Sequence, residues 1–131
     1  MVDLEPIALP PAMPLRLPEI LMDNGLAKLG DAYINLLYSY TLGCISGTPT
    51  GKRVSDQTLF HVAWATGLRQ LLPRRTPKGR VADAVESLLA YAWLRGVISF
   101  EKMVSVSVDG AKGFEDTLTV IVNKVLKSFE A

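Results

Sequence analysis

The sequence predicts an all-α fold class, and three observations lead to this prediction. Four long segments, at about 24–43, 55–72, 79–94 and 113–129, have the apolar patterning of helices. Stretches rich in glycine, proline, serine and threonine separate them, as expected for loops. The one alternating stretch, Val-Ser-Val-Ser-Val at 104–108, has no apparent partner strand elsewhere, which favours a helix there as well.

Composition limits the class of protein before any motif is considered. A chain of 131 residues, of which 49% are apolar, is expected to form one globular domain. Cys44 is the only cysteine, which excludes an internal disulfide framework and a cysteine-cluster zinc site. No apolar run reaches the ~18 residues of a membrane span, and no secretory signal pattern is present. A cytoplasmic protein with no membrane contact is therefore expected.

Residues 1–17 are expected to form a proline-rich extended arm ahead of a single domain at 18–131. Five of the eight prolines lie in the first eighteen positions, and such a segment favours polyproline conformation over helix. Its interspersed apolar residues fit an arm packed against the domain or a partner subunit, and a frayed tail is the alternative. Pro18 suits the start of a short helical turn, and Asp23 or Asn24 can cap the helix that follows.

The first long helix, from about residue 24 to Gly43, contains two residues that break local rules. Gly30 costs about 1 kcal/mol relative to Ala inside a helix, and Asp31 beside the apolar stripe needs a compensating cation or hydrogen bond. A structural explanation pairs Asp31 with Lys28 and gives Gly30 a role in close helix packing. The alternative is a functional site, where such violations are common. The stripe comprises Leu26, Leu29, Tyr33, Leu36, Leu37 and Tyr40.

The second long helix is predicted from about residue 55 to Leu72, with Gly67 inside it. His61 is expected to be a structural or surface residue rather than a metal ligand, because the chain has no second histidine. Trp64 is expected in the core. The patterns after Gly96 predict a short helix at 100–106 capped by Ser99 and a last helix at 113–129, whose buried side comprises Leu118, Ile121, Val122, Val125 and Phe129.

The third long helix, at 79–94, carries two acids on one face. Asp83 lies early in this helix, where the helix dipole by itself explains an acid. Glu86 lies further in among apolar residues, where the dipole explains less. If this helix crosses the first one near Asp31, three carboxylates converge and repel one another unless a divalent ion binds. An all-oxygen set of ligands suits Mg²⁺ or Mn²⁺.

Basic residues gather in the middle of the chain, although the net charge is only +1. Residues 52–80 contain seven Lys or Arg and one acid, Asp56, so this segment carries +6 and the remainder −5. Such asymmetry is typical of a surface that faces phosphates, and a solvated loop with a solubilising face is the alternative. The candidate phosphate-binding residues are Lys52, Arg53, Arg74, Arg75, Lys78 and Arg80.

The order of the motifs resembles the ribonuclease III family. Leu-x-x-Leu-Gly-Asp-Ala at 26–32, followed by an apolar helix, resembles the signature helix of that family. Ala-Asp-Ala-Val-Glu-Ser-Leu at 82–88 is similar to its second acidic motif, and the stretches 54–59 and 67–68 are similar to its connecting helix. The matches run in the same order over residues 24–95.

The resemblance implies a carboxylate metal site, and the chain departs from the family's pattern there. The family signature usually reads Glu-x-x-Glu-x-x-Gly-Asp, and Asn24 and Ala27 stand at its two Glu positions. The family typically uses four carboxylates, of which Asp31, Asp83 and Glu86 are carried over. These three are the candidate catalytic and metal-ligating residues, with Mg²⁺ or Mn²⁺ as the expected cofactor.

The resemblance also implies an activity and partners. It implies a metal-dependent endoribonuclease that hydrolyses phosphodiester bonds in double-stranded or structured RNA, with the cation activating a water and stabilising the departing 3′-oxygen. It implies a homodimer with the signature helices near the interface, and recognition of the duplex by shape and phosphates. The six basic residues then become candidate RNA-binding residues. The run at 49–53 resembles the short archaeal branch, and no separate double-stranded-RNA-binding domain fits in 18–131.

Two other classes of function remain open from the sequence. A catalytically degenerate family member would bind structured RNA, or scaffold a ribonucleoprotein, without cutting it, and the missing acid at position 27 motivates this alternative. A helical protein-interaction domain would use the acids as surface charge and the proline-rich arm as a docking strand. Salt-sensitive RNA binding separates the RNA functions from the interaction domain, because phosphate contacts release counterions.

Overall fold

A computed structural model describes residue 14 and residues 16–110 and 113–130 of the chain. Within these residues all regular structure is helical, which confirms the all-α prediction. Nearly all of the arm expected at 1–17 lies outside the described residues. The helices are α1 (Leu17–Leu21), α2 (Asn24–Ser46), α3 (Asp56–Thr66), the short 3₁₀ helix η1 (Leu68–Leu71), α4 (Lys78–Leu94), α5 (Phe100–Asp109) and α6 (Phe114–Lys127).

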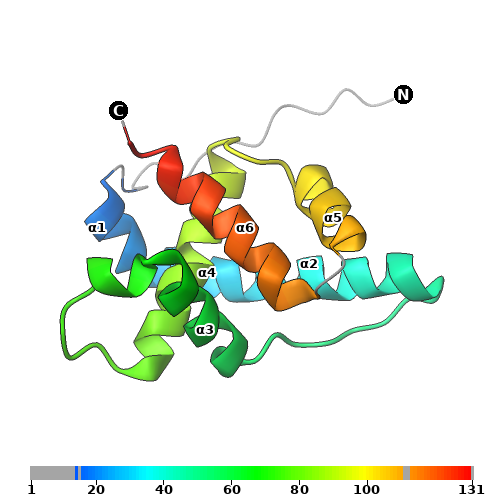
Figure 1. Ribbon diagram of the computed structural model, residues 1–131, viewed down its shortest axis with the longest axis horizontal. Helices are drawn as coiled ribbons and strands as arrows, with labels where there is room; N and C mark the ends of the chain where they lie inside the picture. Colours follow the sequence, from blue (N-terminus) through cyan, green and yellow to red (C-terminus); the bar gives the residue numbers. More distant parts are fainter. Residues whose placement is uncertain (1–13, 15, 111–112, 131) are drawn as a thin grey trace.

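Helix α4 forms the centre of the molecule. It packs against α1, α2, α3 and α6, and Figure 1 shows it crossing behind α6. Almost every side chain from Val81 to Ala92 is buried. A helix that is apolar on all sides belongs in an interior, so an acid in the middle of α4 is removed from solvent.

Helix α2 runs along the length of the molecule (Figure 1) and supplies one wall of the core. The Asp23 side chain caps it by accepting a hydrogen bond from the Leu26 amide at 2.8 Å. The helix continues past the predicted end at Gly43, because the left-handed residue that stops it is Gly47, with φ of 78°. The predicted apolar stripe is wider than the core can cover, since Leu29, Leu36 and Tyr40 are exposed.

The prediction of one helix from about residue 55 to Leu72 is wrong. Gly67 adopts a left-handed conformation, with φ of 80°, that ends α3 at Thr66, and the chain continues as η1. Trp64 is not in the core either, because it is 51% exposed. It packs edge-on against Phe60 and beneath the Arg69 guanidinium instead.

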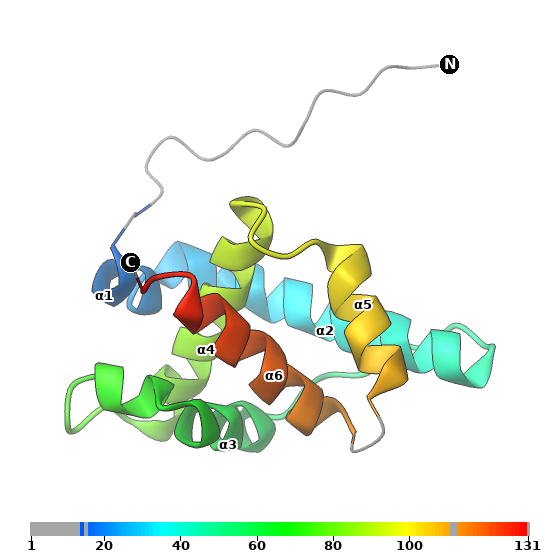
Figure 2. The same ribbon diagram turned by 45° about the horizontal axis from the view of Figure 1, so that its top comes forward.

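Helices α5 and α6 complete the domain, and Figure 2 shows them beside each other. The prediction of helix rather than strand at 104–108 is confirmed, and the Ser99 side chain caps α5 by accepting from the Lys102 amide at 3.0 Å. The predicted buried side of α6 is also confirmed, except that Phe129 is only partly buried. No helix among the described residues is long and apolar enough to cross a membrane.

Candidate functional site

Helices α2 and α4 meet at the closest point of their crossing through Gly30. A Cβ atom built at Gly30 would overlap the backbone carbonyl of Glu86, so the crossing requires a residue with no side chain. This confirms the packing role expected for Gly30. The same contact places the acid that follows Gly30 on α2 beside the acids of α4.

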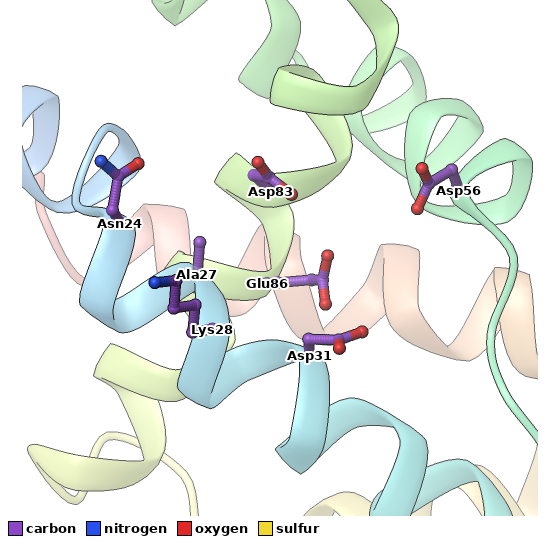
Figure 3. A pocket seen from close by; sticks show the side chains of 7 residues that line it. All are labelled: Asn24, Ala27, Lys28, Asp31, Asp56, Asp83 and Glu86. Atoms are coloured by element: carbon purple, nitrogen blue, oxygen red, sulfur yellow. The ribbon is translucent and has the colours of Figure 1, made fainter.

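A cavity of about 380 Å³ lies at this crossing. Asp31, Asp83 and Glu86 all line it, so the structure brings the three predicted acids to one cavity (Figure 3). Asp56, which the sequence analysis left without a role, lines it as well. The signal that could have identified Asp56 is its position as the one acid in a strongly basic segment. The complete lining is Asn24, Ala27, Lys28, Asp31, Asp56, Asp83 and Glu86.

Glu86 is the most enclosed of these acids. It is only 4% exposed, and its Oε2 atom is buried without a hydrogen-bond partner among the described residues. Burial first, and then the negative charges of Asp31, Asp83 and Asp56, together raise the pKa of Glu86 from its ordinary 4.5 to about 8. In the metal-free protein Glu86 is therefore mostly protonated at neutral pH.

Asp31 is paired with a cation that the sequence analysis did not assign to it. The Arg53 guanidinium donates to Asp31 Oδ1 at 3.2 Å and to Oδ2 at 3.4 Å. The side-chain amide of Asn35, one turn later on α2, also donates a hydrogen bond to Asp31 Oδ1, at 3.2 Å. The expected partner Lys28 makes no ion pair with Asp31 in the described structure, so that explanation of Asp31 is wrong.

Asp83 lies at the rim of the cavity beside a second guanidinium. Arg80, one turn earlier on α4, approaches Asp83 Oδ2 at 3.8 Å. Arg80 also donates a hydrogen bond of 2.7 Å to Asn24 Oδ1 at the start of α2. These contacts hold Arg80 between the two helices and place a positive charge next to the acids.

A divalent cation fits the chemistry of this cavity. Carboxylate oxygens are the ligands that Mg²⁺ and Mn²⁺ prefer, and a buried acid with an unpartnered oxygen faces the same space. No three acidic, histidine or cysteine side chains of the described residues are close enough to form a ready-made metal site. Binding of a cation would therefore require the carboxylates to turn toward it.

The six candidate RNA-binding residues occupy different surroundings. Arg53 and Arg80 contact groups of the cavity, as described. The Lys78 ammonium donates a hydrogen bond to Gln57 Oε1, and it lies 5.2 Å from the centre of the Phe60 ring. The others are exposed, namely Lys52 in the segment before α3 and Arg74 and Arg75 in the loop before α4. Their contact with RNA stays a prediction.

Arg69, a basic residue outside that set, shapes the loop before α4. Its guanidinium donates to the backbone carbonyl of Pro73 at 3.2 Å and to that of Arg74 at 2.8 Å. These two hydrogen bonds hold the loop in place, and they fix the backbone position from which the Arg74 and Arg75 side chains extend into solvent.

Fold and site together define an all-helical domain with a carboxylate-lined cavity at the crossing of its two longest helices. The family model described as Ribonuclease III matches residues 24–125, which include α2, α4 and the cavity. This match covers most of the chain, so the chain belongs to the ribonuclease III family. Membership of this family supports an RNA-processing nuclease. The comparison with curated proteins gave no match.

Proposed function

We propose that this protein is a metal-dependent endoribonuclease that hydrolyses phosphodiester bonds in double-stranded or structured RNA. The observation that carries the proposal is the crossing at Gly30, which gathers Asp31, Asp83 and Glu86 on one cavity in a chain of this family. Three acids from two helices around one cavity are hard to explain by stability alone, because neighbouring like charges repel.

In this proposal Asp31, Asp83 and Glu86 hold Mg²⁺ or Mn²⁺. When bound, the cation would help to activate a water and would stabilise the negative charge on the departing oxygen. Glu86 has to give up its proton before it can act as a ligand. Asp31 has to turn from Arg53, which frees that guanidinium to bind an RNA phosphate.

RNA binding is proposed to rest on charge and shape. The catalytic domain would face an A-form duplex with its basic side chains on phosphates, without reading base edges. Arg53 and Arg80 flank the acids, so they would position the phosphodiester beside the cation. The remaining candidates, Lys52, Arg74, Arg75 and Lys78, would extend the contact along the backbone.

A homodimer is proposed as the working form, with a cytoplasmic location. The exposed face of α2 carries Leu36 and Tyr40, which are 56% and 53% exposed. Beside them lies a cavity of about 500 Å³ that Gly43 and Cys44 also line. Large exposed apolar side chains gathered on one helix mark an interaction surface, and a second copy of α2 is the partner that the family resemblance implies.

Cleavage of long duplex RNA tests the proposed activity. Purified protein with Mg²⁺ or Mn²⁺ is expected to cut the duplex, and Glu86→Gln is expected to lower the rate at least about 100-fold, since even outer-shell changes at metal sites cost 10–100-fold. Glu19→Gln, the same substitution on the exposed surface of α1, serves as the control and should cut normally. Cleavage that survives Glu86→Gln or excess EDTA would contradict the metal-dependent activity.

An RNA-binding protein without nuclease activity is the second candidate. Two observations favour it: position 27 is an alanine, and the Asp31 carboxylate is already paired with Arg53. This candidate predicts salt-sensitive binding of duplex RNA by a preparation that cuts none of it. Binding is measured by electrophoretic mobility shift at several salt concentrations, in parallel with the cleavage assay.

A further inference from the structure

Asp56 is a fourth carboxylate on the cavity, and the family motifs give it no role. It is the first residue of α3, whereas the other acids come from α2 and α4. In Figure 3 it lies across the cavity from Ala27, with its carboxylate toward the acids. The cavity is therefore bordered by acids from three helices.

The chain before Asp56 is attached to α2 at three successive turns. Lys52 exchanges hydrogen bonds with Ser39, donating its amide to Oγ at 2.8 Å and accepting from Oγ at 3.0 Å. The amide of Val54 donates to Asn35 Oδ1 at 2.7 Å, and the intervening Arg53 contacts Asp31. These bonds hold the start of α3 next to the acid of α2.

Asp56 is an exposed residue at the border of the cavity. Its carboxylate has no ion-pair partner among the described residues. It lines the same cavity as Glu86, which is more than nine-tenths buried and has an unpartnered oxygen. The dipole of α3 explains why an acid is tolerated at this position. It does not explain why that acid borders a cavity that already holds three others.

We propose that Asp56 supplies the carboxylate that position 27 lacks, so that the divalent cation is bound between α2, α3 and α4. This inference rests on the proposed metal-dependent function. Asp56 then joins Asp31, Asp83 and Glu86 as the fourth carboxylate and approaches the cation from the α3 side of the cavity. The family's usual fourth acid would stand on the other side, where the chain has Ala27.

Mn²⁺ binding by the full-length protein without RNA tests this assignment. Titration followed by calorimetry or by the electron paramagnetic resonance of free Mn²⁺ gives the dissociation constant. Asp56→Asn is expected to weaken binding at least about tenfold, because losing even an outer-shell partner costs that much. Asp116→Asn is the control, since Asp116 is an exposed first-turn acid of α6 and its loss changes charge and helix dipole equally.

A rescue experiment separates ligation from a structural role. Ala27→Glu in the Asp56→Asn background restores the missing acid on the opposite side and is expected to recover most of the Mn²⁺ affinity. Thermal melts in EDTA should show both Asp→Asn variants folded, with similar small shifts. A helix-dipole role would lower the melting temperature of Asp56→Asn without weakening Mn²⁺ binding, which would overturn the assignment.

The outcomes for Asp56 and for the proposed function are distinguishable. If Glu86→Gln abolishes Mn²⁺ binding while Asp56→Asn binds like wild type, the metal site stands and the assignment of Asp56 is overturned. If wild type binds no Mn²⁺ at millimolar concentration, both are overturned. If Asp56→Asn loses Mn²⁺ but the wild type cuts no RNA, the assignment stands and the nuclease activity fails.

Discussion

Glu86 shows how one residue can be unfavourable for folding and useful for a site. Its side chain sits in the interior helix, where an ionised carboxylate would lose its hydration. The metal-free protein avoids this cost by keeping the acid protonated, as its raised pKa of about 8 indicates. A divalent cation would replace the proton, so metal affinity is expected to increase as the pH rises toward 8.

Stability measured against pH tests the state of Glu86 in EDTA. A folded pKa of about 8, above the ordinary 4.5, means that the folded protein binds more protons than the unfolded chain between these values. The contribution of Glu86 is thus fully present below about pH 4.5 and is lost as the pH rises through 8. The free energy of unfolding of wild type should fall between pH 5 and 8.5 relative to that of Glu86→Gln.

Comparison with Glu86→Gln is needed because other charged groups border the same cavity. Their titration and ion pairing affect both proteins in a similar way, so the difference between the two denaturation curves isolates Glu86. Parallel curves across the whole pH range would mean that Glu86 has an ordinary pKa. The neighbouring groups are Lys28, Asp31, Arg53, Asp56, Arg80 and Asp83.

The crossing of α2 and α4 is the feature at the scale of elements that makes the site. Gly30→Ala is expected to destabilise the fold by about 1–3 kcal/mol, the usual cost of forcing extra atoms into a packed interior. It should also weaken Mn²⁺ binding, because the added methyl group pushes against the backbone of Glu86. Denaturant unfolding measures the first effect and metal titration the second.

Gly79→Ala provides the matched control for the crossing. Gly79 also lies in a helix, but nothing is within 4 Å of a Cβ built there. Alanine there should be neutral or stabilise the protein by up to ~1 kcal/mol, through helix propensity alone. Equal effects of the two substitutions would mean that close packing at Gly30 does not hold the helices together.

The local sequence predicts where a helix begins or ends better than it predicts which face of the helix is buried. The caps at Asp23 and Ser99 were both among the predicted positions, since a cap needs only a side-chain oxygen and the amides of the next turn. The end of α3 was missed because Gly67 is compatible with both continuing and stopping a helix. Its left-handed conformation depends on how the chain turns toward α4.

At the scale of the whole molecule, the exposed face of α2 determines the expected assembly. Leu36→Glu is expected to convert a dimer into a monomer, because it places a charge in the proposed interface without touching the core. Val120→Glu, at a 59% exposed position on α6, is the control and should leave the mass unchanged. Sedimentation velocity measures the mass of each protein, and a monomeric wild type at high concentration would contradict the dimer.

The basic surface also belongs to this scale, because its charges come from three separated stretches of chain. Arg53 precedes α3, Arg74 lies in the loop before α4, and Arg80 lies on α4 itself. In the sequence these residues belong to one charged segment at 52–80. In the fold, Arg53 and Arg80 turn to the acids, so only part of the segment is free to meet a phosphate without first breaking an ion pair or hydrogen bond.

The all-helical class, the caps, the family and three acids of the cavity could all be predicted from the sequence. These follow from apolar spacing and short motifs, which are local properties of the chain. Three features could be read only from the fold: Arg53 rather than Lys28 pairs with Asp31, Trp64 is exposed, and Asp56 lies on the same cavity as the other acids. Each depends on how helices distant in sequence cross and which faces they cover, and no local pattern specifies that.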